Sequence, residues 1–366
     1  MHVTLLRAHP HSAPSMKRVT QAMHRYLPVP CEIRYVSLRP PTILRWRVPA
    51  AVIHVLYVLF TQRYLQHLAA RLPRCDVLHV VDHSESFLFP VTSANRKVVT
   101  CHDLIPLVMQ NIYRHPLSRM LGQWLYRRSI EHLTDAEVII TCSHATASDL
   151  MRLFSVPAQK VKTVYNGVDT GFFTVLPDDL RRRKREELGF QPHEIAILHV
   201  GSNAPYKNIP AVLRTVAHLR HIGHPVRWVK AGQPLPPSHQ RLARELDIAD
   251  CIQVDADTDD LRLRDLYQSC DVLLFPSWRE GFGLPVLESL ACGTPAVIAD
   301  TPALNEWAGK VCPVASPNDV QSLAEKVLLS VEESRSHAVR ARWREFALQF
   351  EWRSIVRQIA EAYAQD

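Results

Sequence analysis

Residues 271–300, DVLLFPSWREGFGLPVLESLACGTPAVIAD, constrain the fold of this chain more than any other stretch. Asp271–Phe275 is a short apolar run with the length and composition of a buried strand. Gly281 and Gly283 follow it, and Pro285–Cys292 is a short helix with proline at its first position and glycine directly after its last. A second apolar run completes the stretch. This order predicts an open α/β sheet with an anion site at a helix N-terminus.

Two carboxylates mark this predicted anion site. Glu280 precedes the glycine loop and Glu288 lies about one turn into the helix. Either acid alone is explained by the helix dipole, which favours negative charge near an N-terminus. Together, on both sides of bare glycine amides, they suit a ligand with an anionic middle and hydroxyl groups at both ends. A nucleotide sugar has this layout.

The segment Glu280-Gly-Phe-Gly-Leu-Pro-Val-Leu-Glu288 closely resembles the E-x7-E signature of retaining GT-B glycosyltransferases, family 4 in particular. The resemblance implies an α/β protein with the GT-B fold, in which two Rossmann-like, doubly wound parallel-sheet domains face an interdomain cleft. It also implies transfer of a hexosyl group from a nucleotide sugar, with retention of configuration at the anomeric carbon.

Composition is typical of a soluble globular protein and permits an anionic partner. A length of 366 residues favours two domains, and a net charge of +7 suits a nucleotide sugar, an anionic lipid surface or nucleic acid. We expect no nucleic-acid partner, because no motif for one is present. The eight cysteines are scattered without a C-x2-C pair, which indicates free thiols in a reducing compartment. With no signal peptide and no apolar run long enough to span a bilayer, we expect a cytoplasmic protein.

Strands and helices alternate in two series, which predicts parallel sheets built from βα units. The turn sequence that begins at Asn166 separates the series. We expect residues 1–166 to form an N-terminal acceptor domain and residues 167–349 a C-terminal donor domain. The resemblance implies that the last helix, within 350–366, crosses back onto the first domain.

A second motif follows the first strand of the second series. The segment from Gly201 through Lys207 to Asn208 resembles the family motif G-x5-K-N, whose lysine holds the donor diphosphate. Asn208 is a plausible N-cap of the helix that follows. Many family members have arginine directly after the glycine, where this chain has Ser202, and Arg279 is a candidate substitute. An exposed lysine without a ligand is the alternative for Lys207.

The resemblance gives each of these residues a role in donor binding. Glu280 would hold sugar hydroxyls and Glu288 the ribose, while Lys207 and the amides of the glycine loop would stabilise the departing diphosphate. The expected catalytic residues are His102, Glu280 and Lys207. The expected donor-binding residues are Gly201, Ser202, Lys207, Arg279, Glu280, Gly281, Phe282, Gly283, Leu284 and Glu288.

His102 and Asp103 stand at the end of a strand in the first series, where open α/β sheets bind ligands. Their segment, HDLIP, resembles a family segment whose histidine lies near the reacting face of the donor sugar. Asp103 would orient His102 or bind acceptor. The loop after the first strand lacks the glycines common in the family, so Ser15 and Met16 become acceptor-side candidates.

No metal and no other cofactor is expected besides the nucleotide-sugar donor, GDP-mannose or a UDP-sugar. The acidic segment Asp255–Asp260 contains DxD patterns, but it precedes a helix, where aspartates serve as caps. GT-B enzymes in general bind the diphosphate without a metal, so we interpret these aspartates as caps.

A membrane interface is an open alternative for residues 45–65. Arg45, Trp46 and Arg47 precede an apolar helix, which suits the bilayer surface and equally a helix packed on its own sheet. Contact with the cytoplasmic face of a membrane would agree with a lipid-linked acceptor.

Overall, we expect a retaining hexosyltransferase, mannosyl favoured, that acts on a saccharide or lipid-linked saccharide in surface polysaccharide or glycan biosynthesis. Two alternatives stay open. One is a nucleotide-sugar epimerase of the same fold, which would convert donor without acceptor. The other is a catalytically silent scaffold, which the missing glycines and Ser202 would permit.

Overall fold

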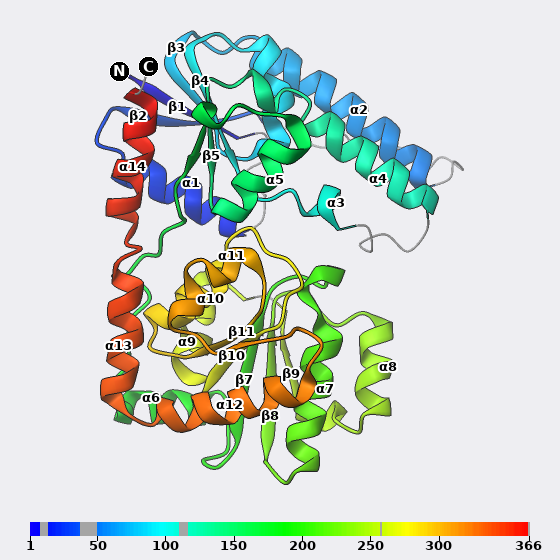
Figure 1. Cartoon of the computed structure of the whole chain (residues 1–366), viewed down its shortest axis with the longest axis vertical. Helices are drawn as coiled ribbons and strands as arrows, with labels where there is room; N and C mark the ends of the chain where they lie inside the picture. The colour runs from blue at the N-terminus through cyan, green and yellow to red at the C-terminus, as the bar shows by residue number, and fades with distance from the viewer. Residues whose placement is uncertain (8–13, 37–49, 110–115, 257, 365–366) are drawn as a thin grey trace. The chain divides into compact units, whose positions relative to one another are not determined.

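The computed structural model describes the whole chain except residues 8–13, 37–49, 110–115, 257 and 365–366 (Figure 1). The chain divides into two compact units. Unit 1 contains Met1–Asn166 and Trp352–Asp366, and unit 2 contains Gly167–Glu351. The junction falls within the turn sequence around Asn166.

Unit 1 is built on a six-stranded parallel sheet in the order β2-β1-β3-β4-β5-β6. The strands are β1 (Val3–Arg7), β2 (Cys31–Tyr35), β3 (Cys75–Val80), β4 (Ala94–Cys101), β5 (Val138–Thr141) and β6 (Val161–Thr163). The strand order reverses beside β1, and the crevice at such a switch point is where open α/β sheets take ligands. The carboxyl ends of β1, β3 and β4 therefore define the functional edge of this unit.

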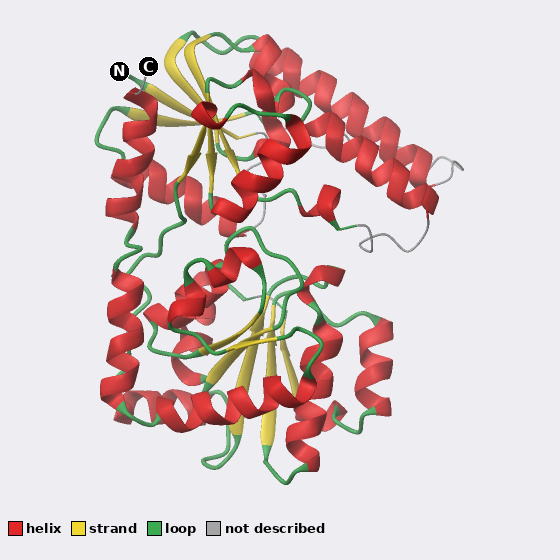
Figure 2. Ribbon diagram, viewed as in Figure 1, coloured by secondary structure: helices red, strands yellow, loops and turns green. Residues whose placement is uncertain are grey.

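Helices and 3₁₀ turns cover both faces of this sheet (Figure 2). They are α1 (Pro14–Tyr26), α2 (Ala50–Ala69), η1 (His83–Val91), α3 (Ile105–Val108), α4 (Pro116–Ser129), η3 (Leu133–Asp135), α5 (His144–Phe154), η4 (Ala158–Lys160) and α14 (Trp352–Ala364). Ser143 caps α5 by accepting a hydrogen bond from the Thr146 amide. The C-terminal helix α14 packs on α1, and its Tyr363 hydroxyl lies 2.6 Å from His79 Nδ1 on β3.

Unit 2 repeats the architecture with the order β12-β11-β10-β7-β8-β9, again with parallel pairs. The strands are β7 (Ile195–Val200), β8 (Val226–Ala231), β9 (Ile252–Asp255), β10 (Val272–Phe275), β11 (Ala296–Ala299) and β12 (Val314–Ala315). The helices and 3₁₀ turns are α6 (Asp178–Glu187), η5 (Pro205–Lys207), α7 (Ile209–His221), α8 (Pro237–Glu245), η6 (Ala249–Cys251), α9 (Asp260–Ser269), α10 (Leu284–Ala291), α11 (Pro302–Asn305), η7 (Ala308–Lys310), α12 (Val320–Ser334) and α13 (His337–Leu348). The carboxyl ends of β7, β8 and β10 meet at one edge.

The two doubly wound parallel sheets confirm the fold class expected from the sequence. The segment Lys310–Val314 reads as a strand in the sequence, but only its last residue lies in one. The amides of Val311 and Cys312 both donate to the Ala308 carbonyl in a tight turn, and Pro313 has no amide hydrogen, so only Val314 and Ala315 pair with β11. All eight cysteines are free thiols.

Candidate functional site

The glycine loop between β10 and α10 has a backbone that only glycine tolerates at its last position. Gly283 adopts φ +97°, and a Cβ there would lie 2.5 Å from Leu304 Cδ2. The preceding Phe282 ring stacks on Trp307 with centroids 4.7 Å apart, and the Phe282 carbonyl accepts a 2.9 Å hydrogen bond from Trp307 Nε1. Trp307 therefore holds both the ring and the backbone of Phe282 in place. Nothing in the loop sequence pointed to this tryptophan.

The first turn of α10 has backbone amides with no acceptor inside the helix, as at every helix start. Within the described residues, the Gly283 and Leu284 amides make no hydrogen bond. The expected loop residues Gly281, Phe282, Gly283 and Leu284 thus lie together at the positive end of a helix. This arrangement favours an anionic ligand.

Lys207 and Glu280 meet at this edge of the sheet. Lys207 Nζ lies 2.7 Å from Glu280 Oε1, and the two side chains are 12% and 8% exposed. The ammonium also lies 4.8 Å from the centroid of the Phe275 ring at the end of β10. Two motifs that are 73 residues apart therefore form one nearly buried ion pair. In this structure the Glu280 carboxylate is engaged with the cation next to it.

Glu288 is less open than its place in the sequence suggested. The residue is 2% exposed, and its Oε2 accepts a 2.9 Å hydrogen bond from the Tyr267 hydroxyl on α9. Tyr267 itself is fully buried. The Glu288 carboxylate is therefore held in the protein interior by Tyr267 of α9. Sequence reasoning missed Tyr267, because only the packing of α9 on α10 brings it here.

Gly201 and Ser202 follow β7 and lead to Lys207. A Cβ on Gly201 would lie 3.4 Å from Lys207 Cε, so the lysine side chain folds back over the glycine. The Ser202 hydroxyl accepts a 3.4 Å hydrogen bond from the Ala204 amide. Arg279 lies half-buried in the loop directly before Glu280.

The expected side-chain cap at Asn208 is wrong. Asn208 does occupy the N-cap position of α7, but with φ +53°, and its side chain makes no cap hydrogen bond. Instead its Nδ2 donates to the carbonyls of Pro276, at 3.1 Å, and Pro317, at 2.8 Å. A left-handed backbone turns the amide away from the helix and toward the end of β10. Asn208 thereby links the turn that contains Lys207 to the end of β10, the strand that leads into the glycine loop.

In unit 1, His102 has one ring nitrogen engaged and one without a partner. His102 Nε2 donates a 2.8 Å hydrogen bond to the Val81 carbonyl, so Nδ1 carries the lone pair of a neutral ring. Nδ1 is buried and finds no hydrogen-bond partner in the described part of the chain. Burial lowers the pKa of His102. The ring is thus a neutral acceptor at the carboxyl edge of the sheet.

The expectation that Asp103 orients His102 is wrong. Asp103 Oδ1 accepts a 3.0 Å hydrogen bond from the Ile105 amide at the start of α3, and Val81 orients the histidine instead. Near them, His83 Nε2 lies 2.8 Å from the Tyr126 hydroxyl, which also reaches the Asp103 carbonyl at 3.2 Å. The turn after β4 is therefore fixed through its backbone.

The acceptor-side candidates Ser15 and Met16 lie in the first turn of α1 and are partly exposed. Residues 8–13 of the loop before them lie outside the described residues. The Met16 carbonyl accepts a 3.2 Å hydrogen bond from Arg7 Nη1. Arg7, at the end of β1, is 1% exposed, and its Nε lies 3.6 Å from Glu85 Oε2. Sequence reasoning missed this buried arginine, because the β1 segment reads as an ordinary strand.

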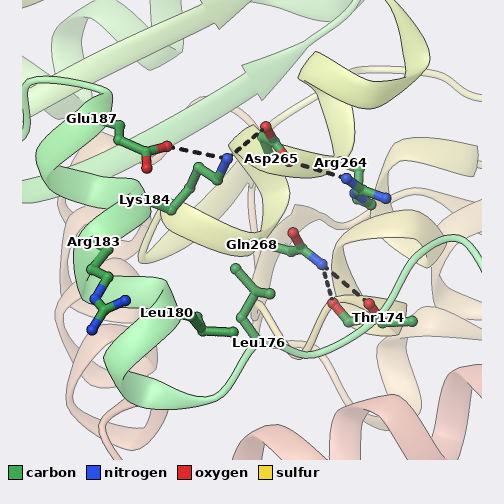
Figure 3. A pocket seen from close by; sticks show the side chains of 9 residues that line it. All are labelled: Thr174, Leu176, Leu180, Arg183, Lys184, Glu187, Arg264, Asp265 and Gln268. Atoms are coloured by element: carbon green, nitrogen blue, oxygen red, sulfur yellow. Dashed lines mark hydrogen bonds and ion pairs between the residues drawn. The ribbon is translucent and has the colours of Figure 1, made fainter.

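A pocket of unit 2 lies between α6, the segment before it and α9 (Figure 3). Its lining residues are Thr174, Leu176, Leu180, Arg183, Lys184, Glu187, Arg264, Asp265 and Gln268. Lys184 Nζ joins α6 to α9 through a 3.1 Å contact with Asp265 Oδ2. The pocket includes none of the residues expected to bind donor or acceptor.

The basic run at residues 181–185, RRRKR, predicts a solvated helix face, and the structure agrees for only part of the run. Arg181 and Arg185 pair with Asp271 at 2.8 and 2.9 Å, whereas Arg182 and Arg183 are exposed. The run therefore ties α6 to the start of β10.

In the acidic segment before α9, one aspartate, Asp259, caps the helix. Asp259 accepts a 2.7 Å hydrogen bond from the Arg262 amide, and Asp255 lies 2.5 Å from Arg262 Nε. Asp257 lies outside the described residues. Over the residues that the structure describes, no group of three or more histidine, cysteine, aspartate or glutamate side chains is arranged to hold a metal ion.

Two family models match the chain. The model described as Glycosyl transferases group 1 matches residues 181–350, and the model described as Glycosyltransferase Family 4 matches residues 18–172. The first match lies within unit 2, and the second lies almost wholly within unit 1.

Among curated proteins, the chain is similar to O-antigen chain mannosyltransferase B of Escherichia coli, at 28% identity over 79% of this chain and 75% of the relative. It is also similar to D-inositol 3-phosphate glycosyltransferase 2 of Catenulispora acidiphila, at 35% identity over 50% of this chain and 43% of the relative. The MMP alpha-(1->4)-mannosyltransferase of Mycolicibacterium hassiacum is 28% identical over 75% of this chain and 65% of the relative. The chain thus spans about three quarters of the first relative and less than two thirds of the other two.

Solved structures share the fold over nearly the whole chain. Sucrose-phosphate synthase from Thermosynechococcus elongatus superposes with a TM-score of 0.74 at 16% identity, covering 99% of this chain and 98% of that chain. Anabaena Alr3699/HepE in complex with UDP and glucose gives 0.72 at 18% identity, with coverage of 99% and 98%. WaaG, a glycosyltransferase involved in lipopolysaccharide biosynthesis, gives 0.71 at 15% identity and covers 100% of both chains.

Proposed function

Because this chain belongs to the family 4 glycosyltransferases of the GT-B fold, we propose that it transfers a hexosyl group, mannosyl in first place, from a nucleotide sugar to a saccharide or lipid-linked saccharide acceptor with retention of configuration. The observation that carries the proposal is the Lys207–Glu280 pair beside the glycine loop. A cation, a helix N-terminus and a carboxylate meet there, which is the chemistry that a diphosphate with a hydroxylated sugar requires.

The donor diphosphate competes with Glu280 for Lys207. A diphosphate carries more charge than a carboxylate and accepts hydrogen bonds from the Gly283 and Leu284 amides as well, so it draws the ammonium toward itself. Glu280 is then released to accept hydrogen bonds from the sugar hydroxyls. Charge that develops on the leaving diphosphate is stabilised by groups already in position.

His102 acts on the sugar side of the reaction in this proposal. Its neutral ring presents an unshared lone pair at Nδ1, which accepts a hydrogen bond from a sugar hydroxyl. The Val81 carbonyl keeps the proton on Nε2 and so fixes the tautomer. Attack on the same face as the departing phosphate accounts for retention without a carboxylate nucleophile.

The mannosyl preference is supported by two relatives that are mannosyltransferases, at 28% identity each. A UDP-sugar is the competing donor, since Anabaena HepE is seen with UDP and glucose. A thermal-shift panel of GDP, UDP, ADP and dTDP tests donor binding directly. We expect GDP to raise the melting temperature most, with no shift in Lys207→Met; no shift by any of the four would contradict the proposal.

For the acceptor, we propose contact with the cytoplasmic face of a membrane. Both α2 and α4 pack on η1, and they carry large exposed apolar side chains: Phe60 and Tyr64 on α2, Met120 and Trp124 on α4. Amphipathic aromatic groups favour the headgroup region. The described helices are all too short or too polar to cross a bilayer. Residues 37–49, with the arginines and tryptophan that suggested this contact, lie outside the described residues.

A further inference from the structure

Lys230 is a buried lysine whose place in the sheet calls for an apolar side chain. It stands near the carboxyl end of β8, two residues after the fully buried Trp228, and is itself fully buried. In the sheet register it pairs with His199 of β7, so both side chains leave the same face. Burial of an ammonium costs free energy unless a partner compensates for it. Such a position in a strand needs an explanation beyond packing.

The ammonium of Lys230 has two hydrogen-bond partners, and both are backbone carbonyls. Nζ donates to the Gly201 carbonyl at 2.6 Å and to the Ala231 carbonyl at 3.2 Å. Among the described residues, no carboxylate forms an ion pair with it, in contrast to Lys207. Carbonyl dipoles satisfy the donors but supply no negative charge. Among the described residues, the positive charge of Lys230 therefore has no negative charge paired with it.

The contact holds Gly201 in a fixed orientation. The Gly201 amide donates to the Ala231 carbonyl at 3.2 Å while its own carbonyl accepts from Lys230. Gly232 permits this approach, because it has φ +102° and a Cβ there would lie 2.8 Å from the Gly201 carbonyl oxygen. The peptide that leads from β7 toward Ser202 is thus clamped by the end of β8.

Gly201 lies between two ammonium groups. Lys207 Nζ lies 3.9 Å from the position that a Cβ on Gly201 would take, and Lys230 Nζ lies 2.6 Å from the Gly201 carbonyl. In the family pattern a second cation stands at the residue after the glycine, where this chain has Ser202. Lys230 brings a positive charge to the same loop from the neighbouring strand.

We propose that Lys230 is a positioning residue of the donor site, which holds the Gly201 carbonyl in place for binding of a nucleoside diphosphate. From the neighbouring strand β8 it also supplies the second positive charge, which an arginine would provide at the position of Ser202. This inference rests on the proposed function, since it assumes that the diphosphate binds beside Lys207 and the glycine loop. The bound anion provides the counter-charge that the described protein does not.

The titration of Lys230 fits this role. Burial, and in second place the positive charge of Lys207, lower the pKa of Lys230 to about 8. The other charged or titratable groups that face it are His199 on β7, whose pKa burial lowers to about 3, and His239 on α8, whose pKa burial also lowers. On β9 the Asp255 carboxylate is engaged by Arg262. A bound diphosphate stabilises the ammonium, so binding takes up protons near pH 8.

Calorimetric titration of GDP and UDP into the full chain tests the inference. The variant is Lys230→Met, and the matched control is Lys310→Met, a substitution at an exposed lysine of the same unit. At pH 7 we expect Lys230→Met to weaken binding of the preferred nucleotide at least tenfold and Lys310→Met to leave it unchanged. From pH 7 to 8.75 the affinity of the unmodified protein should fall more steeply than that of Lys230→Met. Ionisation of the nucleotide is common to both proteins and cancels in the comparison.

A rescue variant separates charge from fold. Ser202→Arg introduced into Lys230→Met should recover most of the lost affinity, whereas loss through misfolding would not be repaired by a charge in the loop. Equal affinity and equal pH dependence in Lys230→Met and Lys310→Met would overturn the inference and leave the proposed function intact, provided Lys207→Met still abolishes binding. If the unmodified protein binds neither nucleotide, the proposed function fails and the inference fails with it.

Discussion

At the scale of single residues, the expected site residues of each unit are polar groups whose partners lie 21 or more residues away in the chain. His102 is fixed by Val81, Glu288 by Tyr267, and Lys207 by Glu280. Each pair combines burial with one well-formed hydrogen bond, so the polar groups are held in place before any ligand arrives. Preorganisation of this kind lowers the cost of stabilising charge in a transition state.

His102→Gln tests the sugar-side role of the histidine. The glutamine amide nitrogen reaches about as far as ring Nε2 and can still donate to the Val81 carbonyl, but glutamine has no acceptor at the position of Nδ1. We therefore expect donor turnover to fall at least ~100-fold while nucleotide affinity stays within twofold. Turnover and calorimetric affinity measured on the same preparation distinguish the two effects. Unchanged turnover would show that His102 has only a structural part.

Several of these residues were predictable from the sequence and their partners were not. Lys207 and Glu280 stand in motifs of fixed spacing, which mark the strand ends where ligands bind. Tyr267, Trp307 and Lys230 stand in segments that read as ordinary helix, loop and strand. Their roles depend on which elements pack together, and local sequence patterns do not specify that.

At the scale of elements, the glycine loop before α10 is the most constrained segment of unit 2. Its shape depends on a left-handed backbone at Gly283 and on the close approach of Leu304. The N-cap prediction at Asn208 was wrong for a reason of the same kind. The Asn208 side chain donates to the Pro276 and Pro317 carbonyls of neighbouring elements instead of capping its own helix. The helix boundary was correct and the side-chain direction was not.

Gly283→Ala should destabilise the protein and abolish nucleotide binding. We expect a loss of about 2–4 kcal/mol in the free energy of unfolding, because an added Cβ meets both backbone strain and Leu304. Gly223→Ala is the matched control: it has φ +93° but open space around a Cβ, so it should cost only about 1 kcal/mol. Equal losses in chemical denaturation would mean that the contact with Leu304 is unimportant.

Helices α2 and α4 lead to a prediction about membrane binding. Phe60→Ser combined with Trp124→Ser should reduce cosedimentation with vesicles of phosphatidylglycerol and phosphatidylcholine severalfold, because two exposed aromatic groups are lost from the surface. Leu329→Ser, at an exposed position of α12 in unit 2, is the control and should bind vesicles normally. If the double variant binds as well as the control, these helices are not the membrane contact.

At the scale of the whole molecule, each unit contains a fully buried neutral histidine. Burial lowers the pKa of His79 in unit 1 and of His199 in unit 2 to about 3, from an ordinary value of 6.5. Below about pH 6.5 the unfolded chain therefore binds protons that the folded chain does not, and folding stability falls as pH drops toward 3.

Thermal unfolding between pH 7 and pH 4.5 checks this prediction, and His79→Gln identifies the contribution of unit 1. The glutamine amide can replace ring Nε2 in the hydrogen bond to Thr100, and it does not titrate. We expect the melting temperature to fall with pH, and to fall less steeply in His79→Gln. If the melting temperatures of the unmodified protein and of His79→Gln fall equally with pH, His79 does not contribute to the loss of stability.

The fold class followed from the sequence because alternating strands and helices leave few arrangements other than parallel sheets. The first loop of unit 1 was the least predictable part of the molecule. Arg7 at its entrance is buried against Met16 and Glu85, and only the packing of α1 and η1 reveals that.

Turnover of GDP-mannose and of UDP-glucose, measured as release of nucleoside diphosphate with a membrane extract as acceptor, tests the central claim most directly. The unmodified protein should turn over one of these donors and form a product that keeps the anomeric configuration of the donor sugar. Lys207→Met and Glu280→Gln should each reduce turnover at least ~100-fold, while Lys310→Met retains it. Undiminished turnover in both site variants would contradict the assignment of the Lys207–Glu280 pair to the donor.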